Sequence, residues 1–128
     1  MAHARHYTVE QANAAIPWVQ ERLDQLRVAR EGLNDEDARA ALAEAGPANG
    51  GGAPGRVVSA AFLSMRDALA ELREMEVVLR DLDRGLVDFP ALREGREVYL
   101  CWIEGEAEIG YWHEPEAGFE GRRPLTDG

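Results

Sequence analysis

Apolar residues in the first third of the chain recur at the spacing of an amphipathic helix. Thr8 is followed three residues later by Gln11, which is the capping-box pattern of a helix start. The apolar positions after it lie mostly three or four residues apart: Ala12, Ile16, Val19, Leu23, Leu26 and Leu33, with Arg30 in the slot before Leu33. We therefore predict a helix over residues 8–44. Pro17 lacks an N–H and crowds the preceding turn, so we expect a kink or a break there.

A second helical pattern covers residues 57–84. Its apolar positions form a stripe that continues after a shift of one residue: Val58, Phe62, Met65, Leu69 and Leu72, then Met75, Leu79 and Leu82. Gly85 can adopt a positive φ and is a suitable stop. Residues 46–55 read GPANGGGAPG, a composition typical of a passive, flexible loop. Two long amphipathic helices joined by such a loop are expected to form an antiparallel hairpin.

The pattern changes to strands over residues 96–113. Two apolar runs flank Glu104-Gly105, which is a plausible two-residue hairpin turn. This register pairs Leu100 with Ile109 and gives one apolar face: Val98, Leu100, Trp102, Ala107, Ile109 and Tyr111. We expect that face to cover the helices. The opposite face carries apolar residues beside several glutamates, and we expect it to be exposed: Tyr99, Cys101, Ile103 and Trp112.

These elements predict an α+β fold, in which an antiparallel helical hairpin packs against a C-terminal antiparallel β-hairpin. We treat residues 1–128 as one domain that ends in a tail over residues 114–128, where Phe119 is expected to cap the core. The N-terminal residues, including His3 and His6, are expected to fray.

Charge and composition exclude several functions. The net charge of −10 argues against nucleic acid, since such binders need basic residues on phosphates. All fourteen basic residues are arginine, so a P-loop lysine and a Schiff-base lysine are excluded. A single cysteine, Cys101, rules out an internal disulfide, and we expect its thiol to be inert. With no long apolar run and no signal-like start, we expect a cytoplasmic protein that does not enter a membrane.

His113 is the histidine with the most interesting surroundings. Glu114 follows it directly, and a histidine beside carboxylates can hold a divalent metal or act as a general base. A hydrogen-bonded structural histidine is the competing interpretation. We predict that any ligand or metal site lies around Asp88, His113, Glu114 and Arg122, with His113 and Glu114 the candidate metal ligands. No cofactor and no catalytic residue is assigned. The aspartates in DLDRGLVD match a calcium loop poorly.

Two stretches resemble a known prokaryotic family. They are YTVEQANAAIPWV near the start, and DLDRGLVDFPALREGREVYLCW followed by GEAEIGYWHEPEAGFEGRRPL. Together they are similar to the family catalogued as domain of unknown function 2203. The resemblance implies a stand-alone protein of this size and order of elements, and it carries over no catalytic residue.

The sequence favours a non-enzymatic interaction module that forms a homodimer. The apolar residues of the predicted outer hairpin face, Tyr99, Cys101, Ile103 and Trp112, are the expected interface, because tyrosine and tryptophan are enriched at protein interfaces. The alternative is a small ligand- or metal-binding protein, possibly hydrolytic, with the four-residue site named above.

Overall fold

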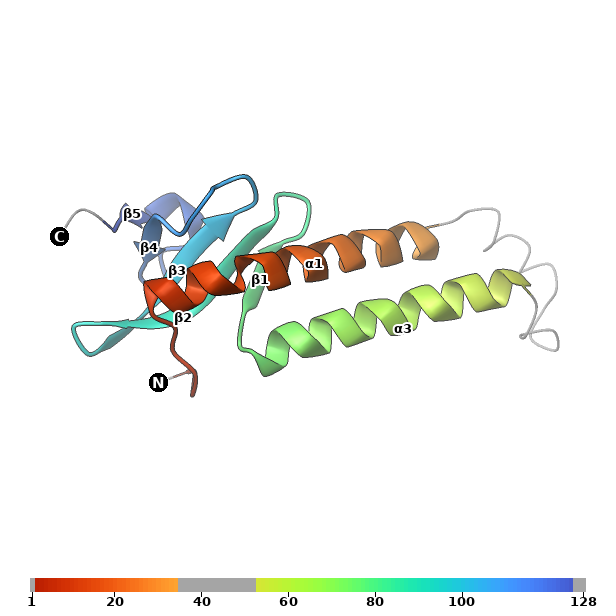
Figure 1. Cartoon of the computed structure of the whole chain (residues 1–128), viewed down its shortest axis with the longest axis horizontal. Coiled ribbons are helices and arrows are strands. Elements are labelled where there is room, and N and C mark those ends of the chain that lie inside the picture. Colours follow the sequence, from red (N-terminus) through yellow and green to blue (C-terminus); the bar gives the residue numbers. More distant parts are fainter. Residues whose placement is uncertain (1, 35–52, 126–128) are drawn as a thin grey trace. The chain divides into compact units, whose positions relative to one another are not determined.

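The computed structural model describes residues 2–34 and 53–125 (Figure 1). The elements run in the order α1 Val9–Leu33, α3 Ala53–Glu74, β1 Val78–Asp81, β2 Leu86–Arg93, β3 Arg96–Ile103, β4 Tyr111–His113, the 3₁₀ turn Phe119–Gly121 and β5 Arg123–Pro124. The strands form one antiparallel sheet in sequential order. The predicted α+β class is therefore confirmed. The chain divides into two compact units, Arg22–Glu71 and the remainder.

Helix α1 begins where the sequence predicts. The backbone N–H of Thr8 donates to Oε1 of Gln11 at 2.9 Å, and the N–H of Gln11 donates to Oγ1 of Thr8 at 3.1 Å. Both halves of the capping box are thus formed. The helix continues through Pro17 to Leu33, so of the two alternatives expected there, a kink or a break, the break is wrong. Fully buried Ala12 and Val19 on either side of the proline hold both neighbouring turns in place. The predicted extension from residue 35 to 44 lies outside the described residues.

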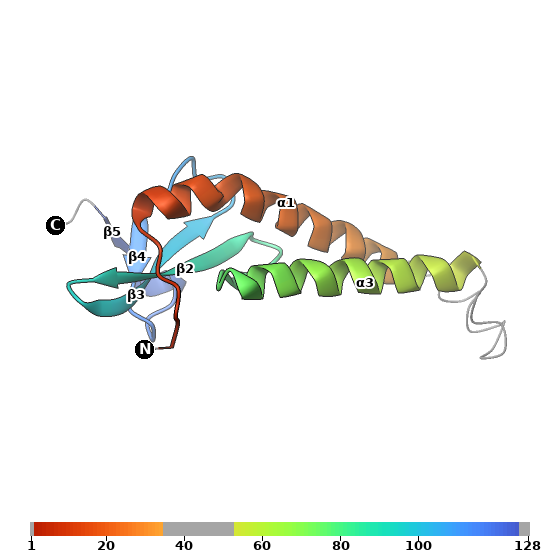
Figure 2. The ribbon, with the colours of Figure 1, turned by 60° about the horizontal axis from the view of Figure 1, so that its bottom comes forward.

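The smaller unit is a helical arm, which we define as residues 22–33 of α1 and 53–71 of α3. Nε of Arg22 lies 2.7 Å from Oε2 of Glu71, and Nε2 of Gln25 donates to the carbonyl oxygen of Ser64 at 3.0 Å. A residue further along α1 thus contacts a residue earlier in α3, so the two helices run antiparallel. The two helices run side by side in both views (Figures 1 and 2). The antiparallel helical hairpin is confirmed within this unit.

The buried side of α3 differs from the predicted stripe. Ala61 and Ala68 are buried, whereas Phe62 and Leu69 from the predicted stripe are exposed. The buried face is centred on Ala61, Ala68 and Leu72, of which only Leu72 belongs to the predicted stripe. A Cβ atom added at Gly32 would come within 2.8 Å of that of Ala61, so the helices approach closely there. Only small side chains fit between helices at such a separation, which explains why alanine faces inward.

Helix α3 ends at Glu74, so the prediction of a helix to residue 84 is wrong. The N–H of Glu76 donates to the carbonyl of Arg73, and the N–H of Val77 to that of Leu72, both at 3.0 Å. These two bonds, with Glu76 at φ 56°, form a Schellman motif. The usual glycine signal is absent from this position, which is why the end was not foreseen. The helix also starts at Ala53, inside the predicted loop; residues 46–52 of that loop lie outside the described residues.

The main hairpin joins β2 to β3. Strand β3 has the bounds of the predicted apolar run, and β2 pairs with it from Leu86↔Ile103 to Arg93↔Arg96. The two turn residues, Glu94 and Gly95, have φ angles of 53° and 78°. Positive φ at both positions is the signature of a type I′ turn, whose twist suits a two-residue hairpin. Strands β1 and β2 were missing from the prediction, as was β5 in the tail.

The predicted pairing after β3 is wrong by three residues. Leu100 pairs with Trp112, not with Ile109, and Tyr99 pairs with His113. The connection is longer than two residues, because Nε1 of Trp102 donates to the carbonyl of Glu106 at 2.9 Å and the N–H of Ile109 donates to Oδ1 of Asn13 on α1 at 2.6 Å. An odd shift exchanges the faces of the later strand. Trp112 therefore lies on the face of Leu100.

Both faces of the central strands are buried. Val98, Leu100, Trp102 and Ile109 are buried as predicted, while Ala107 is exposed and Tyr111 half-buried. The expectation of an exposed opposite face is wrong: Tyr99, Cys101 and Trp112 are buried and Ile103 is half-buried. The first half of α1 packs beside one face, where Val9, Val98 and Trp112 line a common pocket.

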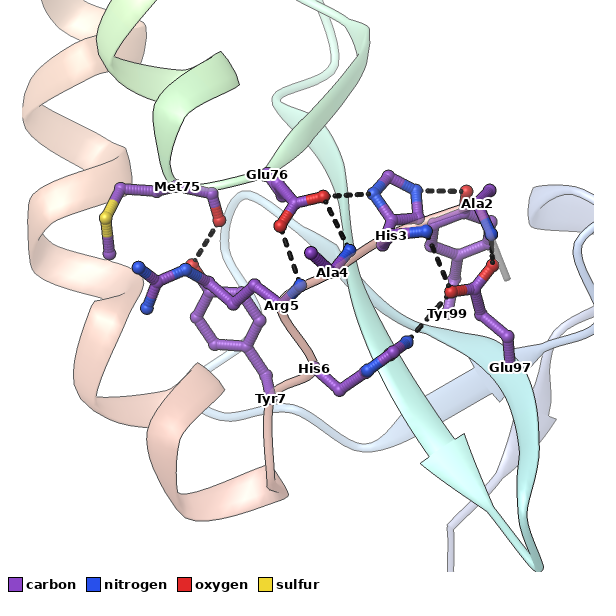
Figure 3. A network of polar contacts seen from close by, with 10 residues as sticks. All are labelled: Ala2, His3, Ala4, Arg5, His6, Tyr7, Met75, Glu76, Glu97 and Tyr99. Carbon is purple, nitrogen blue, oxygen red and sulfur yellow. Dashed lines mark hydrogen bonds and ion pairs between the residues drawn. The ribbon is translucent and has the colours of Figure 1, made fainter.

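Residues 2–7 form an N-terminal strap, so the expected fraying is wrong (Figure 3). Oε1 and Oε2 of Glu76 accept hydrogen bonds from the backbone N–H groups of Ala4 and Arg5, at 3.2 and 2.7 Å. Glu97 accepts from the N–H of His3 at 3.1 Å and lies 2.8 Å from Nε2 of His6. The N–H of Tyr7 donates to the carbonyl of Pro90 at 2.7 Å. Two carboxylates far apart in the sequence thus hold a segment that has no hydrophobic periodicity.

Candidate functional site

Asp88, Cys101 and His113 gather on one face of the sheet. They come from the adjacent strands β2, β3 and β4, in which Asp88 lies directly opposite Cys101 and His113 directly opposite Tyr99. Because side chains alternate along a strand, Tyr99 and Cys101 point to the same side, and His113 joins them. Asp88, Cys101 and His113 are 2%, 0% and 1% exposed. The register therefore collects a carboxylate, a thiol and an imidazole in the interior.

Asp88 is the centre of a buried charge network. Its Oδ1 lies 3.0 Å from Nε2 of His113, and its Oδ2 accepts a hydrogen bond from Nε of Arg80 on β1 at 2.8 Å. A buried carboxylate is costly unless it is paired and hydrogen-bonded. Each oxygen of Asp88 has a cationic or protonated group within reach. We refer to Arg80, Asp88, Cys101 and His113 as the polar cluster.

The two ring nitrogens of His113 both face acceptors. Nδ1 lies 2.7 Å from the backbone carbonyl oxygen of Glu114, which can only accept, so Nδ1 carries a proton. Nε2 faces the carboxylate of Asp88. Burial lowers the pKa of His113. The hydrogen bonds to Asp88 and to the Glu114 carbonyl, together with the charge of Asp88, outweigh this effect, so the pKa lies above its ordinary value. The geometry and the direction of the shift both favour the imidazolium form.

Cys101 is a neutral thiol in this setting. Burial, and then the neighbouring charge of Asp88, raise its pKa to about 12. The thiolate is the reactive and metal-binding form of cysteine. In the absence of a bound cation, Cys101 is therefore unreactive at neutral pH, as the sequence predicts.

Tyr99 connects the polar cluster to the N-terminal strap. Its ring centroid lies 5.6 Å from that of His113, and the guanidinium carbon of Arg80 lies 5.1 Å from the Tyr99 ring centroid. Its hydroxyl group lies 2.8 Å from Nε2 of His3 (Figure 3). The strap thus contacts a side chain that packs directly against the cluster.

The structure brings the side chains of two of the four residues predicted to form a ligand site into direct contact. Asp88 and His113 meet, as described above. The side chain of Glu114 lies 3.4 Å from Arg96, and only its backbone reaches His113. Arg122 lies 3.0 Å from Glu106, stacks at 3.9 Å on the ring of Tyr111 and donates a hydrogen bond to the thiol of Cys101. Arg122 therefore borders the polar cluster through Cys101, whereas the Glu114 side chain is directed at Arg96, and a ligand site at these four residues stays a prediction.

Sequence reasoning missed Arg80 and Cys101 as partners of Asp88. Arg80 was assigned to a helix, and Cys101 to the outer hairpin face. Their meeting with Asp88 depends on β1 and β2, which were not predicted. The turn signal Glu94-Gly95 between two apolar runs could have revealed β2, since such a dipeptide favours a hairpin. Once β2 is paired with β3 across this turn, counting residues outward from the turn places Asp88 opposite Cys101.

A second candidate site is the outer surface of the helical arm. Large apolar side chains are exposed there: Val28 at 69%, Phe62 at 56%, Leu63 at 45% and Leu69 at 37%. Phe62 and Leu69 are seven residues apart and lie on the same side of α3. Scattered single apolar residues need no explanation, but several on one short element indicate an interaction surface.

The comparisons identify the family. A family model described as Uncharacterized conserved protein (DUF2203) matches residues 5–125, and the chain belongs to that family. The match includes residues 5–7 of the strap and all four residues of the polar cluster. Searches of curated proteins and of solved structures give no match. Among the described helices, none is long and apolar enough to cross a membrane.

Proposed function

We propose that the protein is an interaction module that pairs with a second copy of itself through the helical arm. The observation that carries this proposal is the distribution of side-chain size in α3. The small residues Ala61 and Ala68 are buried, while the large residues Phe62 and Leu69 are exposed. Exposed apolar surface is stabilised when a partner covers it, at roughly 25 cal/mol per Å².

The charge of the arm favours a second copy as the partner. A chain with a net charge of −10 repels its own copies. The described part of the arm, however, carries almost equal numbers of basic and acidic residues: Arg22, Arg27, Arg30, Arg56 and Arg66 against Asp24, Glu31, Asp67 and Glu71. The acidic excess therefore lies elsewhere, and two arms can approach without strong repulsion.

The arm also has a suitable shape for self-association. Two antiparallel helices present one long surface, and two such hairpins pack into a four-helix bundle with large apolar residues at its core. A two-fold axis would place the same residues of both copies in the interface. This moves the dimer surface away from Tyr99, Cys101 and Trp112, which are buried within the chain.

Substitution of the exposed apolar residues tests the proposal. The double variant Phe62→Gln/Leu69→Gln keeps good helix formers and removes the apolar contact. We expect the wild type to elute as a dimer by light scattering behind a sizing column, and this variant as a monomer. Leu92→Thr, which alters an exposed apolar residue of β2, is the matched control and should remain dimeric. A variant that keeps the dimer mass, or a control that loses it, contradicts the arm as interface.

The alternative of a ligand- or metal-binding protein is favoured by a separate observation, the gathering of Asp88, Cys101 and His113. Binding at these three residues does not depend on self-association.

A further inference from the structure

We propose that Asp88, Cys101 and His113 bind one zinc ion inside the sheet. Each residue offers one ligand atom, and the three atoms, a carboxylate oxygen, a thiol sulfur and a ring nitrogen, all lie within 4.8 Å of one another. Zinc bonds of about 2.0–2.3 Å in tetrahedral geometry separate ligand atoms by roughly 3.3–3.7 Å. The three atoms therefore need shifts on the order of 1 Å or less, which rotation of the side chains can supply.

The surroundings orient two of the ligands. Metal-binding histidines almost always donate the other ring N–H to a carbonyl or a carboxylate. In His113, Nδ1 donates to the carbonyl of Glu114, which leaves Nε2, 3.0 Å from Oδ1 of Asp88, as the nitrogen for a metal. The carboxylate is held in the same way, because Arg80 occupies Oδ2 and leaves Oδ1 directed at the histidine. Arg80 and the Glu114 carbonyl are thus positioned as outer partners of a metal site.

Metal binding requires deprotonated ligands, and a coordinating thiol is deprotonated by the metal itself. Cys101 would therefore bind zinc through a thiolate and His113 through a neutral imidazole, with the displaced protons released to solvent.

The ligand types select zinc among common cations. A thiolate and an imidazole suit zinc, whereas calcium and magnesium require oxygen ligands. Three protein ligands leave a fourth tetrahedral position, which water fills in zinc sites of this kind. The competing account is that the polar cluster is a purely structural hydrogen-bonded group.

Cobalt(II) absorption distinguishes the two accounts, because Co²⁺ replaces zinc and reports on its ligands. The whole chain is titrated with Co²⁺ under reducing conditions, and zinc is then added in competition. We expect one Co²⁺ per chain, tetrahedral bands in the visible range and a thiolate charge-transfer band, all displaced by one equivalent of zinc. In Cys101→Ser the thiolate band should vanish, and zinc affinity should fall at least tenfold.

Two further variants keep the test decisive. His3→Gln/His6→Gln removes the histidines of the strap and should leave the spectrum unchanged. Arg80→Gln alters an outer partner whose side chain is 41% exposed, so folding is preserved; zinc affinity should fall about 10- to 100-fold with the thiolate band retained. The proposal is overturned if the wild type takes up no Co²⁺, if the spectrum lacks a thiolate band, or if uptake is lost in the strap variant. Circular dichroism confirms that each variant is folded.

Discussion

Removing the carboxylate of Asp88 is the sharpest test of how the sheet is held together. Asp88 is 2% exposed and lies between Nε of Arg80 at 2.8 Å and Nε2 of His113 at 3.0 Å. Asp88→Ala leaves the buried imidazole of His113 without its partner. Breaking a buried ion pair by deleting one member costs about 3–5 kcal/mol, since an uncompensated charge remains. His113 can lose its proton to limit this loss, so the lower half of that range applies.

The expected loss is a large part of the total stability. A domain of this size unfolds with about 5–15 kcal/mol. Asp88→Asn keeps the shape and one acceptor oxygen, so its cost should be smaller, about 1–3 kcal/mol, the range for an imperfectly satisfied buried polar group. Asp83→Ala, at an exposed position in the turn after β1, is the matched control and should change stability by less than about 0.5 kcal/mol.

Urea unfolding followed by circular dichroism in metal-free buffer measures all three variants. The order of loss should be Asp88→Ala, then Asp88→Asn, then Asp83→Ala. A loss below about 1 kcal/mol for Asp88→Ala would refute the reasoning, because a buried carboxylate paired with a buried histidine cannot be removed at so small a cost. An equal loss for Asp83→Ala would show that the effect is not specific to the polar cluster.

Three other substitutions test separate parts of the fold. Leu100→Ala should destabilise the chain by about 2–5 kcal/mol in urea unfolding, because Leu100 is buried, whereas exposed Glu108→Ala should cost little; similar losses would contradict the register. Glu94→Asn should stabilise the hairpin by about 0.5–1 kcal/mol, since asparagine tolerates the positive φ of a type I′ turn, and a lower melting temperature would argue against that turn. The pKa of Glu97 is lowered by its bond to His6, so its contribution to stability is present above the ordinary glutamate pKa and is lost as pH falls through the lowered value. Glu97→Gln should therefore be less stable than wild type at pH 7, with a difference that shrinks in acid; a constant difference would sink this account of the strap.

The sequence predicts best those elements whose signal is local. The Thr8–Gln11 capping box and the apolar run of β3 are formed at the expected places. The α3 prediction failed at its end because Glu76 takes a backbone conformation usually reserved for glycine. Its carboxylate is bound by the strap, and that contact joins residues about 70 positions apart. A local sequence pattern cannot reveal a contact between residues so far apart.

Only part of the candidate site can be predicted from the sequence, because the contacts that form it join residues far apart in the chain. His113 was conspicuous beside its acidic neighbours, but adjacency in sequence favoured Glu114, whose side chain turns to Arg96. The true neighbours of His113, Asp88 and Cys101, follow from pairing across three strands. A shift of three residues in the pairing of β3 with β4 exchanges the two faces of β4. Trp112, predicted to lie on an exposed face, is therefore buried on the face of Leu100.

The mass of the wild-type chain in solution tests the proposed function most directly. Sedimentation equilibrium of this 128-residue chain at micromolar concentrations reports mass without reference to shape. The chain mass is 14.1 kDa, and pairing through the helical arm predicts twice that value, falling to the single-chain mass in Phe62→Gln/Leu69→Gln. A wild type that sediments with the mass of one chain across the whole concentration range would contradict the proposal.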